Sequence, residues 1–427
     1  MKFIFADSMD VVDPHFDFLR EQNGKGRQKY WDDQYPHEIL GYAPYDGMLV
    51  SRAIVGDAGR GGKYSESESM RFRRVGARSF LRLNNEKFSG QMLFGDCGAF
   101  SYAKETVPPF KAPDTVEFYG DGCFTHGCSI DHIIFDFDVN AKGLSSGTND
   151  SRERFEITLE LASEFLEESK ILGEEFTPVG VVQGWSPDSM ATAAQRLIDM
   201  GYQYIAIGGL VPLAVDEIHQ AVDAVEAVAK TKNGVKIHLL GFGKADNLHE
   251  FKRYSRIASF DTTSPLLRAF KDHTKNYYLP SSSDSIEYFS AIRIPQAIDN
   301  NRLKSHAKSG RFSQEHLLKL EQRALNLLRA FDTNAASIEE TLDALIEYAE
   351  PLVWTANMND ETLKRKLHSL RIKYKKTLDH KPWKLCSCNI CLTAGVETLI
   401  FRGSNRNKRR GIHNLAVFYD HVRRTLN

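Results

Sequence analysis

The chain has 427 residues, of which 42% are apolar and 26% are charged, as in a globular protein with one large and one smaller domain. No apolar stretch reaches about 18 residues, which excludes a transmembrane helix. Asp7 comes too early for a secretory signal, and six cysteines in so long a chain do not indicate a disulfide framework. We therefore expect a cytoplasmic protein without a membrane partner.

Short apolar runs that end in a polar residue or a glycine recur from the N-terminus to about residue 270. Such runs are typical of strands buried on both faces, as in a parallel sheet. The predicted strands are residues 1–7, 92–96, 133–136, 179–183, 205–209, 238–241 and 257–261. Helical patterns at 151–172, 187–200 and 213–230 alternate with them, which indicates βαβ units.

The pattern changes after about residue 285 to long helical segments, such as residues 314–331 and 337–348. We therefore predict a β/α barrel catalytic domain at 1–280. A helical region with a zinc-binding subdomain, packed on the barrel, is predicted at 281–427.

Asp96 and Asp261 are aspartates that each end a predicted strand. In a closed β/α barrel, ligand-contacting groups stand at the carboxyl ends of the strands. The two carboxylates could therefore converge on one bound molecule, one attacking it and the other moving protons.

Near the C-terminus, Cys386, Cys388 and Cys391 lie within six residues and are followed by His413. Three thiolates and one imidazole form a closed tetrahedral zinc set, the pattern of structural sites. His421 is an alternative fourth ligand. Cys123 and Cys128, with His126 between them, are a weaker candidate for a second metal site.

The net charge of −1 hides an asymmetry between the two ends of the chain. Residues 361–427 contain 16 Lys and Arg but 4 Asp and Glu, a net of +12, so the remainder carries −13. A basic end on an acidic body indicates a polyanionic partner, although a solvated tail would show the same composition.

The cysteine and histidine set resembles the zinc subdomain of the tRNA-guanine transglycosylases, TIM-barrel enzymes that exchange guanine for a 7-deazaguanine. Six further segments match this family in chain order. They are Gly-Asp-Cys-Gly-Ala-Phe at 95–100, Phe-Asp at 135–136, Val-Gln-Gly at 182–184, Ile-Gly-Gly-Leu at 207–210, Leu-Gly-Phe-Gly-Lys at 240–244 and Phe-Asp at 260–261. The resemblance implies an α/β fold, a TIM (β/α)8 barrel with a C-terminal helical, zinc-binding subdomain.

The resemblance also implies residue roles. Cleavage of an N-glycosidic bond passes through an oxocarbenium-like state that a carboxylate can trap as a covalent glycosyl-enzyme. Asp261 is the candidate nucleophile, and Asp96 would protonate the departing guanine and later deprotonate the incoming base. The candidate base-binding residues are Phe100, Asp136, Gln183, Gly208, Gly209 and Leu210, with Asp138 as an alternative to Asp136.

Four N-terminal segments, at 6–8, 35–38, 44–47 and 49–52, resemble the DpdA branch of this family, which inserts 7-deazaguanines into DNA. The chain departs from the tRNA enzymes after the nucleophile, where Thr262-Thr263-Ser264-Pro265 replaces Asn-Gly-Arg. We therefore expect a DNA-guanine transglycosylase whose partners are DNA, a 7-deazaguanine base and a helper ATPase.

The segment 210–213, Leu-Val-Pro-Leu, resembles relatives that take 7-cyano-7-deazaguanine. Three other functions stay open. The chain could be a tRNA-guanine transglycosylase, a non-catalytic nucleic-acid-binding subunit, or a hydrolase that releases guanine without replacing it.

Overall fold

The computed structural model describes residues 1–57, 61–281 and 285–426. These residues form two compact units. The first contains Met1–Asp10 and Tyr45–Thr263, with residues 422–426, and the second contains Val11–Pro44 and Ser264–His421. The units do not divide at residue 280, because residues 11–44 and 264–280 group with the helical unit.

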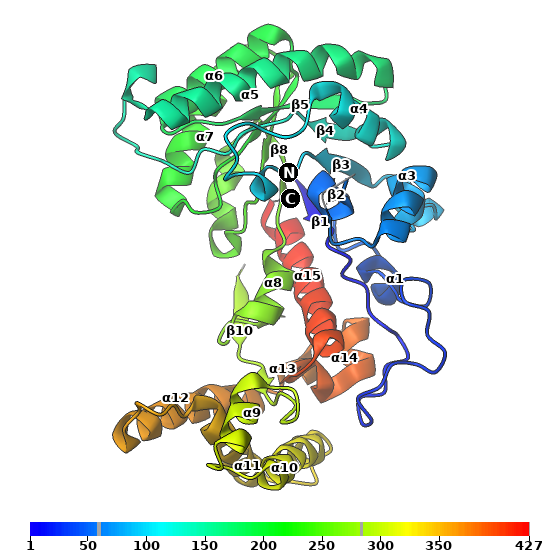
Figure 1. Cartoon of the computed structure of the whole chain (residues 1–427), viewed down its shortest axis with the longest axis vertical. Coiled ribbons are helices and arrows are strands. Elements are labelled where there is room, and N and C mark those ends of the chain that lie inside the picture. Colours follow the sequence, from blue (N-terminus) through cyan, green and yellow to red (C-terminus); the bar gives the residue numbers. More distant parts are fainter. Residues whose placement is uncertain (58–60, 282–284, 427) are drawn as a thin grey trace. The chain divides into compact units, whose positions relative to one another are not determined.

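A closed barrel of eight parallel strands forms the first unit and confirms the predicted TIM barrel (Figure 1). β1 pairs with β2 on one side and with β8 on the other, which closes the sheet. The strands are β1 (Lys2–Ala6), β2 (Gly47–Ser51), β3 (Met92–Asp96), β4 (His126–Cys128), β5 (Thr177–Val182), β6 (Tyr204–Ile207), β7 (Lys236–Leu239) and β8 (Ile257–Asp261).

Apolar side chains that point inward from the strands fill the barrel, as expected for this fold. They include Ile4, Phe94, Val181 and Ala206, all fully buried. β4 is the exception among the strands, since His-Gly-Cys contains no apolar run. The prediction of a strand at 133–136 is wrong, because these residues form no strand. The fourth strand of the barrel is β4, which lies earlier in the chain and has no apolar run by which it could be predicted.

Helices alternate with the strands and cover the outside of the barrel. α5 (Asn149–Glu168), α6 (Pro187–Met200) and α7 (Val215–Ala229) contact β5, β6 and β7, and Figure 1 shows the three helices on the outside of this unit. α6 has the predicted bounds, because the Ser186 side chain caps its start and Gly201 ends it in a left-handed conformation with φ 119°. The remaining helices of this unit are α2 (Arg52–Val55), α3 (Glu66–Phe80) and α4 (Ala112–Asp121).

Long helices dominate the second unit. Its helices are α1 (Pro36–Leu40), α8 (Ser264–Lys271), α9 (Asn301–Lys308), α10 (Gln314–Asp332), α11 (Ile338–Val353), α12 (Asp360–His380), α13 (Pro382–Leu385), α14 (Asn389–Ala394) and most of α15 (Ser404–Leu426). Two small sheets pair β9 (Tyr277–Pro280) with β10 (Ile286–Phe289), and β11 (Ile292–Arg293) with β12 (Ile400–Phe401).

The excursion between β1 and β2 belongs to the second unit because of its apolar side chains. Val12, Ile39 and Leu40 form one buried cluster with Ile390 and Ile412. No helix in the described part of the chain combines the length and apolarity that a membrane crossing requires.

Candidate active site and metal centre

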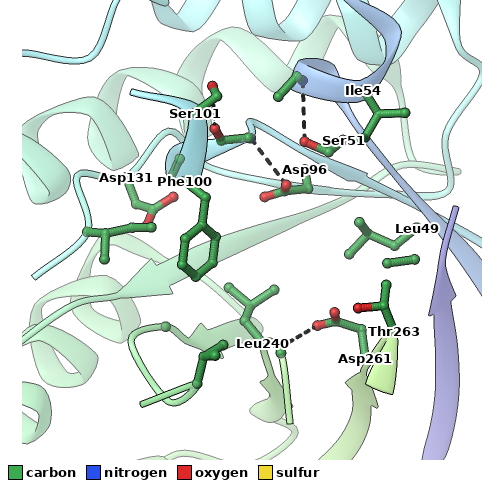
Figure 2. A pocket seen from close by; sticks show the side chains of 18 of the residues that line it. Leu49, Ser51, Ile54, Asp96, Phe100, Ser101, Asp131, Leu240, Asp261 and Thr263 are labelled. Carbon is green, nitrogen blue, oxygen red and sulfur yellow. Dashed lines mark hydrogen bonds between the residues drawn. The ribbon is translucent and has the colours of Figure 1, made fainter. Parts of the chain in front are cut away.

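A cavity of about 450 Å³ opens at the carboxyl ends of the barrel strands. This volume is typical of a site for a small molecule. Its lining residues include Ser51 from β2, Asp96 from β3, Gly208 after β6, Gly241 after β7 and Asp261 from β8. The side chains of Asp96 and Asp261 reach the cavity from different strands, with the Phe100 ring beside them (Figure 2).

Four carboxylates line this cavity: Asp7, Asp96, Asp131 and Asp261. Asp7, Asp131 and Asp261 are only 3%, 4% and 7% exposed. None of the described residues that line the cavity is a lysine, arginine or histidine. The cavity therefore holds buried acidic groups without a basic side chain on its wall, a combination found at functional sites.

Asp96 is poised to exchange a proton near neutral pH. Burial and the nearby charges of Asp131 and Asp261 raise its pKa to about 7, against the opposing effect of hydrogen bonds from Ser51 and the Gly98 amide. The Gly98 N–H donates to Asp96 Oδ2 at 3.2 Å. Gly98 has a φ of 84°, and a Cβ atom there would lie 2.6 Å from the Cβ of Ala53, so the turn requires glycine.

Asp261 lies in a different environment. Its Oδ1 accepts the Gly241 N–H at 2.9 Å, drawn in Figure 2, and lies 3.1 Å from His238 Nε2. These two partners fix the position of Oδ1. The two strand-end aspartates thus differ: one holds a proton near neutral pH, and the other is held by donors.

Asp131 and Gln183 form a polar wall. Asp131 Oδ2 accepts from Gln183 Nε2 at 2.6 Å, and its Oδ1 accepts from the Cys97 thiol at 3.2 Å. Gln183 Oε1 in turn accepts the Ile134 N–H at 3.2 Å, which fixes the amide orientation. Burial raises the pKa of Asp131. Gly208 leaves room for this amide, because a Cβ atom at residue 208 would overlap it.

Six of the predicted site residues line the cavity, and two do not. Those on its wall are Asp96, Asp261, Phe100, Gln183, Gly208 and Gly209. Asp136 is instead exposed and accepts from Ser151 Oγ at 3.0 Å. Leu210 is 1% exposed behind the wall, where Val211 is the lining residue.

The short length of β4 explains why Asp136 does not line the cavity. β4 ends at Cys128, so the residue that it carries to the cavity is Asp131, and Asp136 lies beyond the edge. Asp138, the alternative, is exposed as well and accepts from the Asn140 N–H. Asp7 also lines the cavity, although it was not named as a site residue from the sequence. It directly follows β1, so its position at the end of a predicted strand was the signal that could have identified it.

The Phe100 ring lines the cavity, and the Phe135 ring lies next to it. Phe100 is 64% exposed and Phe135 is 53% exposed, with ring centroids 6.4 Å apart. They offer a flat apolar surface on which a planar ligand can stack.

The predicted metal set comes together in the second unit. The Sγ atoms of Cys386, Cys388 and Cys391 lie 3.5, 3.4 and 3.3 Å from His413 Nδ1, and the four ligand atoms are within 4.8 Å of one another. His413 Nε2 lies 2.7 Å from the Tyr278 carbonyl oxygen, an acceptor that places the ring proton on Nε2 and leaves the Nδ1 lone pair facing the thiols.

These donors fit a tetrahedral ion with soft ligands, as in structural zinc sites. His413, and not the alternative His421, completes the set. Within the residues that the structure describes, no second group of this kind is found, and Cys128 instead packs in the barrel interior.

A DNA-guanine transglycosylase of Salmonella montevideo is 38% identical to this chain over 428 aligned positions. The alignment covers 100% of this chain and 97% of that protein. The chain belongs to the DNA-guanine transglycosylase family. No family model matches the chain.

In this family member, the basic C-terminal region divides into two groups. Arg402, Arg406, Arg409 and Arg410 are buried, and they bind glutamates, backbone carbonyls or side-chain amides. The basic side chains of α12 are instead mostly exposed; they include Lys364, Arg365, Lys366, Lys373, Lys375 and Lys376. The predicted excess of +12 therefore overstates the charge available to a partner.

Proposed function

We propose that the protein exchanges guanine in DNA for a 7-deazaguanine through a covalent intermediate on Asp261. The main support is that one cavity holds two strand-end aspartates in different environments, in a member of the DNA-guanine transglycosylase family. Two successive displacements at one carbon need a nucleophilic carboxylate and a separate acid that returns as a base.

In the proposed first step, an oxygen of Asp261 forms a bond to C1′ of the deoxyribose while the bond from C1′ to guanine breaks. The electron pair of that bond leaves with guanine, and Asp96 supplies the proton that neutralises it. A group with a pKa of about 7 suits this role because it is partly protonated at neutral pH.

In the second step, Asp96 removes a proton from the incoming base. The base then attacks C1′, and the ester bond to Asp261 breaks. Both aspartates return to their initial states, so the exchange needs no external oxidant, reductant or energy source.

We assign recognition of the base to Asp131, Gln183 and the backbone of Gly209, with Phe100 stacking on the ring. A carboxylate can accept from the N–H edge of guanine, and an amide can donate to its carbonyl. Asp131 takes the role first predicted for Asp136, since it lines the cavity beside Gln183 and Asp136 does not.

The incoming base that fits this wall is 7-cyano-7-deazaguanine. Val211 and Gly241 lie close together in the lining, where a Cβ atom on residue 241 would be 2.7 Å from Val211 Cγ2. The small space at this part of the cavity accommodates a linear nitrile group better than a bulky substituent.

DNA is the proposed polymer. A guanine within a duplex cannot reach a cavity at the barrel mouth, so it must be extruded or taken from an opened strand, which costs a few kcal/mol. The exposed basic side chains of α12 provide a surface for phosphates. The requirement for a helper ATPase stays a prediction.

We propose that Cys386, Cys388, Cys391 and His413 hold one zinc ion. With all four positions filled by protein ligands, the ion would have no open position for a substrate. It would therefore supply folding free energy and take no part in the exchange.

The direct test is incubation of the full-length protein with labelled 7-cyano-7-deazaguanine and duplex DNA, single-stranded DNA or tRNA. We expect label in DNA, no label with Asp261→Asn, and unchanged incorporation with Asp136→Asn as the matched control. Label in tRNA alone would support the tRNA enzyme. Guanine release without incorporation would support a hydrolase, and binding without either reaction would support a non-catalytic subunit.

A further inference from the structure

We propose that His238 is a positioning residue that donates a hydrogen bond to Asp261 and thereby selects which of its oxygens attacks C1′. The inference rests on the proposed role of Asp261 as nucleophile. It is carried by a chain of four side chains inside the barrel: Tyr204, Ser259, His238 and Asp261.

The distances define an unbroken chain. Tyr204 OH lies 2.5 Å from Ser259 Oγ, which lies 2.6 Å from His238 Nδ1. On the other side of the ring, His238 Nε2 lies 3.1 Å from Asp261 Oδ1. His238 and Ser259 are fully buried, so water does not compete for these bonds.

Only one direction of donation gives every hydroxyl proton in the chain an acceptor. Burial raises the pKa of Tyr204 to about 12, so its hydroxyl stays protonated and donates to Ser259. The Ser259 hydroxyl then donates to His238 Nδ1, which leaves the ring proton on Nε2. Nε2–H points at the carboxylate, an acceptor.

Aromatic packing fixes the ring in this orientation. Phe94 stacks on His238 with centroids 5.0 Å apart, and His126 stacks on Phe94 at 4.5 Å. Burial, and then the proximity of His238, lowers the pKa of His126 to about 4, so it adds no positive charge at neutral pH. Asp261 from β8 contacts His238 directly, and Tyr204 from β6 is linked to it through Ser259.

The two carboxylate oxygens of Asp261 differ in their hydrogen-bond partners. Oδ1 is held by two donors, the Gly241 N–H at 2.9 Å and His238 Nε2 at 3.1 Å. For Oδ2, no hydrogen bond is found among the described residues, while the side chain itself lines the cavity. Oδ2 is thus the oxygen free to form the bond to C1′, and His238 holds it in place through Oδ1.

The same donor serves the second displacement. When the ester bond between Oδ2 and C1′ breaks, its electron pair returns to the carboxylate, which His238 and Gly241 again stabilise. Loss of the donor should therefore lower kcat while KM stays nearly constant, because His238 is buried behind Asp261 and is not part of the cavity wall.

The test compares His238→Leu, which removes the donor, with His238→Gln, which retains an N–H on a side chain of similar length. We expect His238→Leu to lower kcat by about 10- to 100-fold, the scale for loss of one positioned donor, and to change KM less than about two-fold. The acid limb of its pH–rate profile should move to higher pH, because a carboxylate that loses a donor keeps its proton longer. His238→Gln should recover most of the loss.

His126→Gln is the matched control, since it changes the same aromatic stack without touching Asp261. Should His238→Leu fail to fold, Ser259→Ala replaces it; with the Nδ1 partner gone, we expect a several-fold loss of kcat. Wild-type kcat and pH profile in a folded His238→Leu, or in Ser259→Ala, would overturn the inference. Equal losses in His238→Leu and His238→Gln without a shift of the acid limb would do so too.

Two variants distinguish failure of the proposed function from failure of the role assigned to His238. Exchange activity retained by Asp261→Asn overturns the proposed function and this inference with it. Loss of all exchange in Asp261→Asn beside an unimpaired His238→Leu overturns only the role of His238.

Discussion

The cavity of the barrel unit and the buried arginines of the helical unit differ in how their charge is compensated. In the barrel, four carboxylates line one cavity, and no described residue on its wall is basic. In the helical unit, buried arginines meet partners: Arg406 binds Glu21 and Glu397 at 2.7 Å each, and Arg402 binds Glu321 at 2.7 Å.

This difference in charge compensation indicates that the cavity carboxylates serve the chemistry, whereas the buried arginines serve folding. An uncompensated buried carboxylate raises the free energy of the folded state, so it persists where chemistry requires it. A compensated buried arginine instead specifies how chain segments pack, because its removal takes a counter-charge away from the partner carboxylates. Four predictions examine this contrast.

The largest effect is expected at Asp261. Asp261→Ala should lower base exchange by at least about 1,000-fold, since the proposed covalent path needs this carboxylate. Thermal melting should show a folded protein, because the cavity gains no charge. Steady-state incorporation of labelled base is the measurement, and activity within a few-fold of wild type would remove the covalent mechanism.

Loss of a metal ligand should have the next largest effect, on folding. Cys391→Ser should unfold the helical unit, because a structural zinc site contributes folding free energy directly. Elemental analysis should give one zinc per wild-type chain and none in the variant, and hydrogen exchange should rise across α13 and α14. Cys123→Ser, at an exposed cysteine of the barrel unit, is the control. A native preparation without stoichiometric metal would refute the zinc assignment.

A smaller effect is expected when a buried ion pair is broken. Arg406→Met should lower the free energy of unfolding by about 1–3 kcal/mol, because Glu21 and Glu397 would lose their shared partner, although Glu21 keeps Arg402 and Glu397 keeps Arg329. Chemical denaturation measures this loss, with the exposed Arg365→Met as the comparison. Equal stabilities of the two variants would mean that the buried pairs do not hold the helical unit.

The smallest effect is a gain in stability at Asp96. Its pKa is about 7 in the folded protein and 3.8 when unperturbed, so between these values the folded state binds more protons and stability falls as pH rises. Asp96→Asn should therefore stabilise the protein by about 1–2 kcal/mol at pH 8 and by less at pH 4.5, while it impairs exchange. A larger gain at pH 4.5 than at pH 8 would contradict the raised pKa.

The sequence predicted those parts of the structure whose signal is local. The apolar runs at β3 and β8, the capped helix α6 and the spacing of the cysteines each determine their own conformation or chemistry. Asp96 and Asp261 were found because each directly ends such a run.

The remaining site residues depend on three-dimensional packing. Asp131 was missed because β4 is three residues long and carries no apolar run. His238 looked like the first residue of an ordinary buried strand, since its partners Ser259 and Tyr204 are distant in the chain. The burial of the α15 arginines likewise depends on Glu21, which lies 385 positions from Arg406.

The central claim is that Asp261 forms a covalent bond to C1′, and mass spectrometry of the trapped complex tests it most directly. The protein would be incubated with guanine-containing DNA in the absence of incoming base, denatured, and digested with protease and nuclease. We predict a deoxyribose adduct on the peptide that carries Asp261, present in wild type and absent in Asp261→Asn. An adduct on another residue, or no adduct from a preparation that does exchange base once labelled incoming base is added, would contradict the account.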